Sequence, residues 1–256
     1  MDLSVVIPVK NEAENITPLV GEIRAALDGL CTYEIVYVDD GSTDATAAEI
    51  RNLMMKTPQL RVLRHTQSCG QSAAIRSGVR AARGAWIATL DGDGQNDPAD
   101  IPKLWDFARA APSAPPLLVA GYRRVRRDSW VKRAASRIAN RVRCRLLGDD
   151  TPDTGCGLKL FSRELFLDLP NFDHMHRFLP ALVLRAGGWV RSVPVNHRPR
   201  QGGASKYGVF DRLGVGLVDL CGVIWLQRRA IRPYLLAEPA ADKNTAAPSP
   251  VMSAIQ

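Results

Sequence analysis

Two aspartates separated by a single residue, Asp91 and Asp93, are flanked by glycines and followed by the amide of Gln95. Hard oxygen donors at this spacing can meet on one divalent cation. Mg²⁺ typically takes one or two carboxylates, while water and substrate phosphates complete its shell. Such a cation would neutralise a departing diphosphate. An Asp/Gly surface turn is the alternative interpretation, but the position directly after the apolar run from Ala85 to Leu90 favours a metal site.

A second polar turn runs from Asp39 to Asp44 and follows the apolar run from Glu34 to Val38. A carboxylate at this point can hold ribose hydroxyls or the N–H of a base, and Gly41 allows close approach of the backbone. The residues from Ser42 to Asp44 can cap the helix that follows. Taken alone, this turn would be an ordinary helix cap.

Alternating apolar runs and helical patterns indicate the elements that position these side chains. Continuous apolar runs predict buried strands, and apolar residues at helical spacing predict helices between them. Asn11 and Glu14 resemble a capping box before the first helix. The predicted strands are residues 5–9, 34–38, 60–63, 85–90, 116–120, 157–161 and 189–196, and the predicted helices include residues 71–82 and 179–185. We therefore expect an α/β fold with a mostly parallel, doubly wound sheet that binds ligands at the carboxyl ends of its strands.

Three ordered motifs resemble those of a known enzyme family. They are Val6 to Glu12 (VIPVKNE), Asp39 to Asp44 (DDGSTD) and Asp91 to Gln95 (DGDGQ). Together they are similar to the motifs of family 2 inverting glycosyltransferases with the GT-A fold, and the resemblance covers about residues 3–230. Within that family the chain is most similar to the polyprenyl-phosphate glycosyltransferases of the dolichol-phosphate mannose synthase type. The segments 121–123, 130–137 and 200–208 resemble the acceptor-side motifs of this subgroup.

This resemblance implies a Rossmann-like GT-A domain over residues 1–236, with a nucleotide-sugar half at about 1–115 and an acceptor half at about 116–236. It implies Mg²⁺ or Mn²⁺ on Asp91, Asp93 and Gln95. The residues implied for the nucleotide sugar are Pro8, Val9, Asn11, Glu12, Asp39, Asp40, Ser42, Gln71 and Asp91. Those implied for the acceptor phosphate are Arg123, Lys132, Arg133, Ser136, Arg200, Ser205 and Lys206. The implied catalytic residues are Asp91, Asp93, Arg200 and Lys206.

The implied reaction moves a sugar from a UDP- or GDP-sugar to a polyprenyl phosphate, with inversion at the anomeric carbon. A phosphate monoester has a second pKa near 6, so such an acceptor is largely anionic at neutral pH and needs no general base. A hydroxyl acceptor, in a saccharide for example, would need a carboxylate base, for which Asp153 is the best candidate. A non-catalytic nucleotide-binding or nucleic-acid-binding protein is the third interpretation, but no recognised nucleic-acid motif is present.

Composition and charge limit the remaining function classes. The 256 residues are 46% hydrophobic and 23% charged, which is ordinary for a globular chain that can bury a large core. The net charge of +8 favours an anionic partner such as a phosphate or a lipid headgroup. Five cysteines without a C-x-x-C pair are typical of reduced thiols in a cytoplasmic protein. The small, polar residues 237–256 predict a disordered tail.

Membrane contact is expected to be peripheral. The N-terminus lacks the pattern of a signal peptide, and the apolar segment from Leu213 to Leu226 is shorter than a spanning helix and contains Asp219. Basic residues are concentrated between Tyr122 and Leu147. We therefore expect a cytoplasmic protein on the inner face of the cytoplasmic membrane, with an anionic membrane surface or a membrane protein as partner. The oligomeric state stays open.

Overall fold

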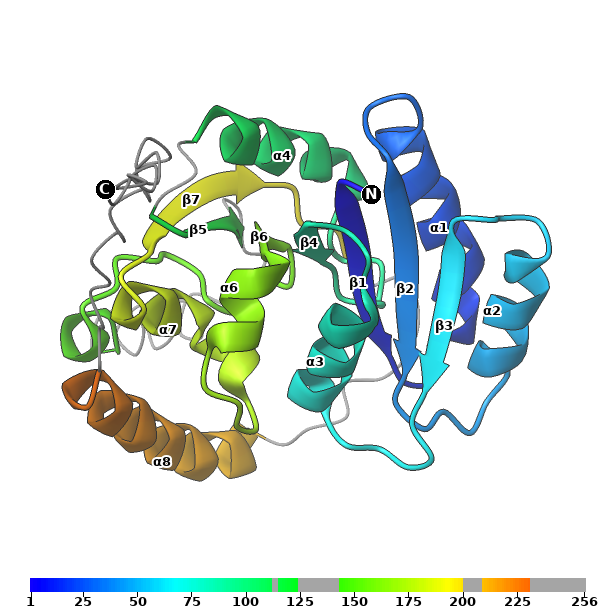
Figure 1. The fold of residues 1–256 in the computed structure, drawn as a ribbon. Coiled ribbons are helices and arrows are strands. Elements are labelled where there is room, and N and C mark those ends of the chain that lie inside the picture. The colour runs from blue at the N-terminus through cyan, green and yellow to red at the C-terminus, as the bar shows by residue number, and fades with distance from the viewer. Residues whose placement is uncertain (112–114, 124–142, 200–208, 231–256) are drawn as a thin grey trace, which may run out of the picture.

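A seven-stranded sheet forms the centre of the fold in the computed structural model, which describes residues 1–111, 115–123, 143–199 and 209–230 (Figure 1). The strand order is β3-β2-β1-β4-β6-β5-β7. The strands are β1 (Leu3–Val9), β2 (Tyr33–Asp39), β3 (Leu60–Arg64), β4 (Trp86–Thr89), β5 (Leu117–Arg123), β6 (Lys159–Ser162) and β7 (Trp189–Val195). Among these described strands, neighbours pair in parallel except for β6, which is antiparallel to both β4 and β5.

Helices cover both faces of the sheet, so the fold has three layers (Figure 1). One face carries α1 (Ala13–Leu27), α2 (Thr46–Met54) and α4 (Ile101–Ala110), and the other carries α3 (Gln71–Ala81), α6 (Arg163–Asp168), α7 (Leu179–Arg185) and α8 (Val209–Arg228). The short 3-10 turns are η1 (Pro98–Asp100) and η2 (Met175–Arg177). Successive strand residues point to opposite faces: Val5 and Ile7 pack against the first helical layer, whereas Val6 packs against the second.

The sequence-based prediction of a mostly parallel α/β sheet is confirmed, and each predicted strand overlaps an observed one. The helices α4 and α6 and the reversed direction of β6 were not predicted. The predicted capping box at Asn11 and Glu14 is wrong. The helix α1 begins at Ala13 without a side-chain cap, because Asn11 turns away into a left-handed conformation and bonds to the β2 turn. The predicted tail, residues 237–256, lies outside the described residues.

Three carboxyl ends meet at one edge because β1 lies between β2 and β4 and runs parallel to both. The polar turns predicted after these strands therefore converge as expected. The antiparallel direction of β6 adds an amino end to the same edge, since Lys159 pairs with Thr89 at the end of β4. The edge also receives the carboxyl ends of β5 and β7, where Arg123 is paired with Val195.

Candidate active site

The loop from Asp91 to Asp97 follows β4 at this edge of the sheet, and it is here called the metal loop after the cation site predicted for it from sequence. Asp91 Oδ1 accepts a hydrogen bond from Gln71 Nε2 at 2.8 Å, and the Asp91 N–H donates to Asn96 Oδ1 at 3.0 Å. Asp93 Oδ1 accepts from the Gln95 N–H at 3.1 Å. These bonds leave Asp91 Oδ2 and Asp93 Oδ2 as further acceptors on the loop.

Burial raises the pKa of Asp91 to about 6, and the negative charge of Asp93 adds to the effect. Two carboxylates that repel one another in a partly buried site are stabilised by a cation. The donor set fits Mg²⁺ or Mn²⁺, because two carboxylates and the side-chain oxygen of Gln95 are hard oxygen ligands and leave positions for phosphate oxygens. The three residues selected by their spacing therefore lie together in one loop at the expected edge.

Gly157 and Lys159 were not predicted, although both lie beside Asp91. A Cβ at position 157 would come within 2.2 Å of Asp91 Oδ2 and 2.7 Å of Asn96 Oδ1. Lys159 is 4% exposed, and its ammonium donates to the carbonyls of Thr154 and Cys156. Burial lowers the pKa of Lys159. Sequence spacing could not reveal these neighbours, because the antiparallel pairing of β6 with β4 brings them to the metal loop.

The turns after β1 and β2 are joined through Asn11, whose φ is 55°. The Asn11 N–H donates to Ser42 Oγ at 2.9 Å, and its side-chain oxygen accepts from the Thr43 N–H at 2.8 Å. A left-handed non-glycine residue is uncommon and is often maintained at functional sites. The sequence predicted that Ser42 would help to cap the next helix, but its hydroxyl instead positions the turn after β1. Asp44, just before α2, accepts a hydrogen bond from the Thr46 N–H through Oδ1 at 3.0 Å.

The two adjacent aspartates at the end of β2 differ in their surroundings. Asp39 is fully buried, and its Oδ1 accepts from the Ser42 N–H at 2.8 Å. Its Oδ2 lies 3.2 Å from Arg64 Nε but has no hydrogen bond from the described part of the chain. A buried carboxylate oxygen without a hydrogen bond, at the carboxyl edge of the sheet, is suited to the N–H or O–H of a nucleotide.

Asp40, in contrast, is fully engaged by the protein. It accepts hydrogen bonds from His65 Nδ1 (2.7 Å), Ser68 Oγ (2.8 Å), the Cys69 N–H (2.8 Å) and the Gly70 N–H (3.0 Å). Burial acts to raise the pKa of Asp40, but these bonds outweigh it and hold the pKa below the ordinary value. The ligand atoms of Asp40, His65 and Cys69 lie within 4.8 Å of one another. Because the carboxylate is already saturated, we assign it to anchoring the loop before α3.

The other residues predicted for the nucleotide sugar lie around these turns. Pro8 and Val9 end β1, and a Cβ at Gly92 would come within 2.3 Å of the Val9 side chain, so the metal loop packs tightly on β1. The Glu12 N–H donates to Thr46 Oγ1 at 2.9 Å. Gln71 begins α3 and reaches Asp91.

On the acceptor side, the Arg123 guanidinium donates two hydrogen bonds to Asp153, from Nε to Oδ2 at 2.6 Å and from Nη2 to Oδ1 at 2.9 Å. Asp153 is 7% exposed. The remaining predicted acceptor residues lie outside the described residues, namely Lys132, Arg133, Ser136, Arg200, Ser205 and Lys206. The structure thus brings together the donor-side residues and Arg123, and the acceptor roles stay predictions.

Residues 4–169 match the model of the family described as Glycosyl transferase family 2. A dodecaprenyl-phosphate galacturonate synthase of Rhizobium johnstonii is 35% identical over 238 residues, which are 91% of this chain and 69% of that protein. An undecaprenyl-phosphate 4-deoxy-4-formamido-L-arabinose transferase of Edwardsiella ictaluri is 35% identical over 216 residues, which are 83% of this chain and 65% of that protein. The chain thus spans about two thirds of the length of these two relatives.

Solved structures share the fold at lower sequence identity. Glucosyl-3-phosphoglycerate synthase from Mycobacterium tuberculosis, in complex with Mn²⁺, UDP and phosphoglyceric acid, has a TM-score of 0.66 and 22% identity over 88% of this chain and 78% of that one. A mannosyltransferase from Pyrobaculum calidifontis, in complex with GDP-Man and Mn²⁺, has a TM-score of 0.59 and 23% identity over 78% of this chain and 58% of that one.

Proposed function

Because this chain belongs to glycosyl transferase family 2 and has the GT-A type of fold, we propose that it transfers a sugar from a nucleotide diphosphate sugar to a polyprenyl phosphate. The observation that carries the proposal is the metal loop, with Asp91, Asp93 and Gln95 at the carboxyl edge of the sheet. The acceptor class is supported by two relatives that are named for dodecaprenyl and undecaprenyl phosphate.

In the proposed reaction, the donor is placed by the turns after β1, β2 and β4. Asp39 Oδ2 accepts from the nucleoside, and the left-handed Asn11 fixes the distance between the first two turns. Asp91, Asp93 and Gln95 would hold Mg²⁺ or Mn²⁺, which supplies neutralisation of the charge that develops on the leaving diphosphate. Gln71 orients the Asp91 carboxylate through its 2.8 Å hydrogen bond.

The acceptor oxygen needs placement more than activation, because a phosphate monoester is already largely anionic near neutral pH. We assign that placement to Arg123 and to the predicted residues Lys132, Arg133, Ser136, Arg200, Ser205 and Lys206. A guanidinium can fork onto two phosphate oxygens, whereas an ammonium acts as a point charge. An in-line attack by this oxygen inverts the anomeric carbon.

A hydroxyl acceptor is disfavoured by the surroundings of Asp153. Both oxygens of this carboxylate are bound by the Arg123 guanidinium, and the Gly155 N–H also donates to Oδ1 at 3.2 Å. A carboxylate that is paired with arginine is a weak proton acceptor. Asp153 is therefore better suited to orienting Arg123 than to acting as a general base.

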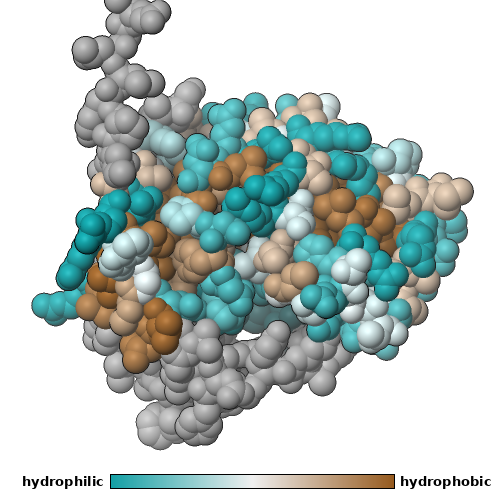
Figure 2. All heavy atoms as spheres, turned by 60° about the horizontal axis from the view of Figure 1, so that its bottom comes forward, coloured by the Kyte–Doolittle hydropathy of each residue, from teal (hydrophilic) through white to brown (hydrophobic). Residues whose placement is uncertain are grey.

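We also propose that the protein works at a membrane surface, which it meets through α8. The described helices include none that is long and apolar enough to cross a membrane. On α8, Asp219 faces inward to His174 at 3.0 Å and Val223 is buried, whereas Val218 is 72% and Trp225 is 59% exposed. Figure 2 shows apolar side chains on the face of the molecule that includes α8.

Basic side chains border this apolar surface. Gln227 Nε2 donates to the carbonyl of Leu147 at 2.8 Å, which places the exposed Leu146 and Arg145 near the end of α8. The guanidinium of Arg229 lies 5.9 Å from the centre of the Trp225 ring. An apolar face with cationic flanks fits an anionic lipid surface. We therefore propose that the partner of this surface is the bilayer that holds the polyprenyl phosphate.

The proposed function is tested by screening UDP- and GDP-sugars with a short polyprenyl phosphate and following release of the nucleotide diphosphate. Release that requires both the lipid and Mg²⁺ or Mn²⁺ is the expected result, with a single inverted anomer in the product. Release with a saccharide acceptor and none with the lipid would reject the proposed acceptor. Asp106, which is exposed on α4, provides the control variant Asp106→Asn, and we expect it to retain activity.

A further inference from the structure

The segment that follows β7 is fastened to the metal loop along its backbone. The Arg198 N–H donates to the carbonyl of Gln95 at 3.0 Å, and His197 forms an isolated antiparallel bridge with Asn96. The Asn196 N–H donates to Asp100 Oδ2 at 2.6 Å. The metal loop is therefore held from its far side by residues about a hundred positions later in the chain.

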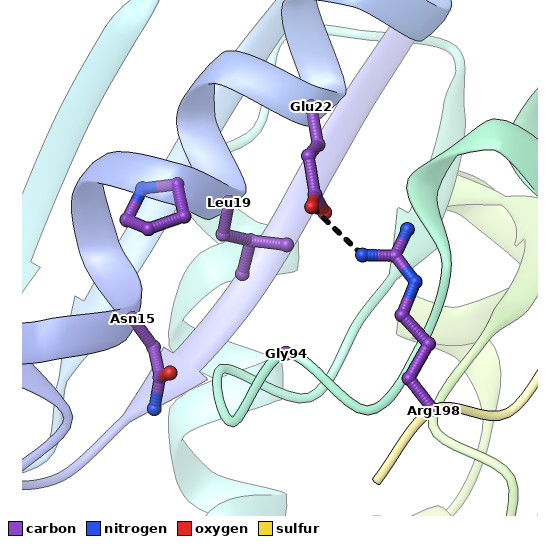
Figure 3. Close-up of a pocket in the computed structure, with 6 residues that line it drawn as sticks. Asn15, Leu19, Glu22, Gly94 and Arg198 are labelled. Atoms are coloured by element: carbon purple, nitrogen blue, oxygen red, sulfur yellow. Dashed lines mark hydrogen bonds and ion pairs between the residues drawn. The ribbon is translucent and has the colours of Figure 1, made fainter. Parts of the chain in front are cut away.

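The side chain of Arg198 adds a second connection, which joins the metal loop to α1. Its Nη1 atom lies 2.7 Å from Glu22 Oε1 (Figure 3). Its Nη2 atom bonds to Asp97 Oδ1. The side chain is 27% exposed and that of Asp97 is 15% exposed. Burial acts to raise the pKa of Asp97, but the bonds from Arg198 and the Ala99 N–H outweigh it and lower the pKa.

A small pocket lies between α1 and the metal loop, and Arg198 lines it together with Asn15, Leu19, Glu22 and Gly94 (Figure 3). Gly94 has a φ of +71° and separates Asp93 from Gln95. Gly94 has no side chain that could pack against α1, and there is open space around it, since a Cβ there would meet only Asn15 Oδ1, at 3.8 Å. The loop is therefore not held by packing at the point between these two predicted ligands. The guanidinium of Arg198 spans this gap from Asp97 to α1.

We propose that Arg198 is a positioning residue for the divalent cation, which acts by holding the metal loop at a fixed distance from α1. The repulsion between Asp91 and Asp93 acts to spread the loop, and a rigid guanidinium with two carboxylate partners opposes that spread. Arg198 would act through the metal loop and not as a ligand of the cation, because its side chain bonds to Glu22 and Asp97. The inference rests on the metal site of the proposed function.

The test measures Mn²⁺ binding directly, from the paramagnetic resonance signal of free Mn²⁺ titrated with protein in the presence of UDP or GDP. Loss of a residue that orients metal ligands typically weakens binding on the order of tenfold. We expect Arg198→Gln to raise the Kd for Mn²⁺ by about that factor. Arg198→Lys keeps the charge but loses the fork, so it should restore part of the affinity.

The matched control is Arg24→Gln on α1, the helix that carries Glu22. Arg24 pairs with Asp28 at 3.6 Å and has no bond to the metal loop among the described contacts. This control should leave the Kd unchanged. Glu22→Gln weakens the ion pair between Arg198 and α1 but leaves the bond from Arg198 to Asp97, so it should weaken Mn²⁺ binding less than Arg198→Gln does. It also provides the test if Arg198→Gln does not fold.

Equal Mn²⁺ affinity in the wild type and in folded Arg198→Gln, or in Glu22→Gln if the former does not fold, would overturn the inference. A wild-type protein that binds no Mn²⁺ with either nucleotide would overturn both the inference and the metal assignment. Normal Mn²⁺ binding without sugar transfer to polyprenyl phosphate would reject only the proposed acceptor.

Discussion

At the residue scale, the position of the Asp91 carboxylate depends on the absence of a Cβ at Gly157. The Asp91 carboxylate lies directly over the backbone of Gly157, in the space that any side chain would occupy. Asn96 Oδ1, which receives the Asp91 N–H, would be displaced as well. A backbone position can thus determine where a predicted metal ligand lies.

We expect Gly157→Ala to weaken metal binding and to lower activity by about tenfold or more, because the new Cβ would displace a carboxylate that the cation needs. Gly21→Ala is the control, since a Cβ at Gly21 in α1 meets nothing within 4 Å. Both variants are compared by Mn²⁺ titration and by the rate of diphosphate release. Wild-type values for Gly157→Ala would show that the Asp91 carboxylate is not a ligand in this position.

Asp93→Asn should lower the rate about a hundredfold, which corresponds to about 3 kcal/mol of barrier, because an amide cannot neutralise the cation that the diphosphate shares. Gln95→Ala should have a smaller effect in the same direction. The rates are measured with saturating donor and acceptor, and excess chelator should abolish the activity of the wild type. Full activity in chelator would reject the metal assignment.

At the element scale, sequence spacing predicted the strands better than it predicted the turns between them. Continuous apolar runs identify β1 and β2, because the burial of these strands on both faces leaves a strong pattern. The capping box failed because Asn11 satisfies the turn after β2 instead of the first turn of α1. Such a choice depends on a contact 31 positions away, which local patterns do not contain.

For the site, too, residues close together in the sequence could be predicted as a group, whereas residues brought in from distant parts of the chain could not. Asp91, Asp93 and Gln95 are close in the chain, so their spacing and their position directly after an apolar strand predict a shared cation. Lys159 and Arg198 reach the metal loop only through strand pairing and through the segment after β7. The direction of β6, which brings Lys159 there, has no distinct signal in four residues of sequence.

The turn η2 is tied to α3 by His176, whose Nδ1 atom lies 2.7 Å from Ser72 Oγ. Burial lowers the pKa of His176 to about 3, and the nearby cations Lys159 and Arg177 add to the shift. The unfolded chain binds this proton below about pH 6.5 while the folded protein does not. The contribution of His176 to stability is therefore complete above pH 6.5 and is lost as the pH falls towards 3.

We expect the melting temperature to fall between pH 6.5 and pH 5, a range in which most carboxylates are still ionised. His176→Gln should flatten this dependence, because glutamine can still bond to Ser72 but does not titrate. An unchanged pH profile of melting in His176→Gln would contradict the assigned pKa.

At the scale of the whole molecule, the charge of +8 and the exposed face of α8 would both favour the proposed partner, an anionic membrane surface. We expect salt-sensitive binding to anionic vesicles, since each basic residue near such a surface contributes about 1 kcal/mol of attraction. Trp225→Ser and the pair Arg228→Gln with Arg229→Gln should both weaken binding in a flotation assay. Asp106→Asn is again the control. Equal binding to neutral and anionic vesicles at all salt concentrations would reject the electrostatic part of this proposal.

The tryptophans of the described residues provide optical probes of separate regions. Trp86 and Trp105 meet edge to face, with ring centres 6.3 Å apart and an interplanar angle of 87°. They lie where β4 begins and α4 packs on the sheet, at the opposite edge from the metal loop. Two indoles this close couple their electronic transitions, so their near-ultraviolet circular dichroism follows the core itself. The contribution of Trp225 to the fluorescence, obtained as the difference between the wild type and Trp225→Ser, follows α8. Unfolding and lipid contact can therefore be followed by two distinct spectral signals.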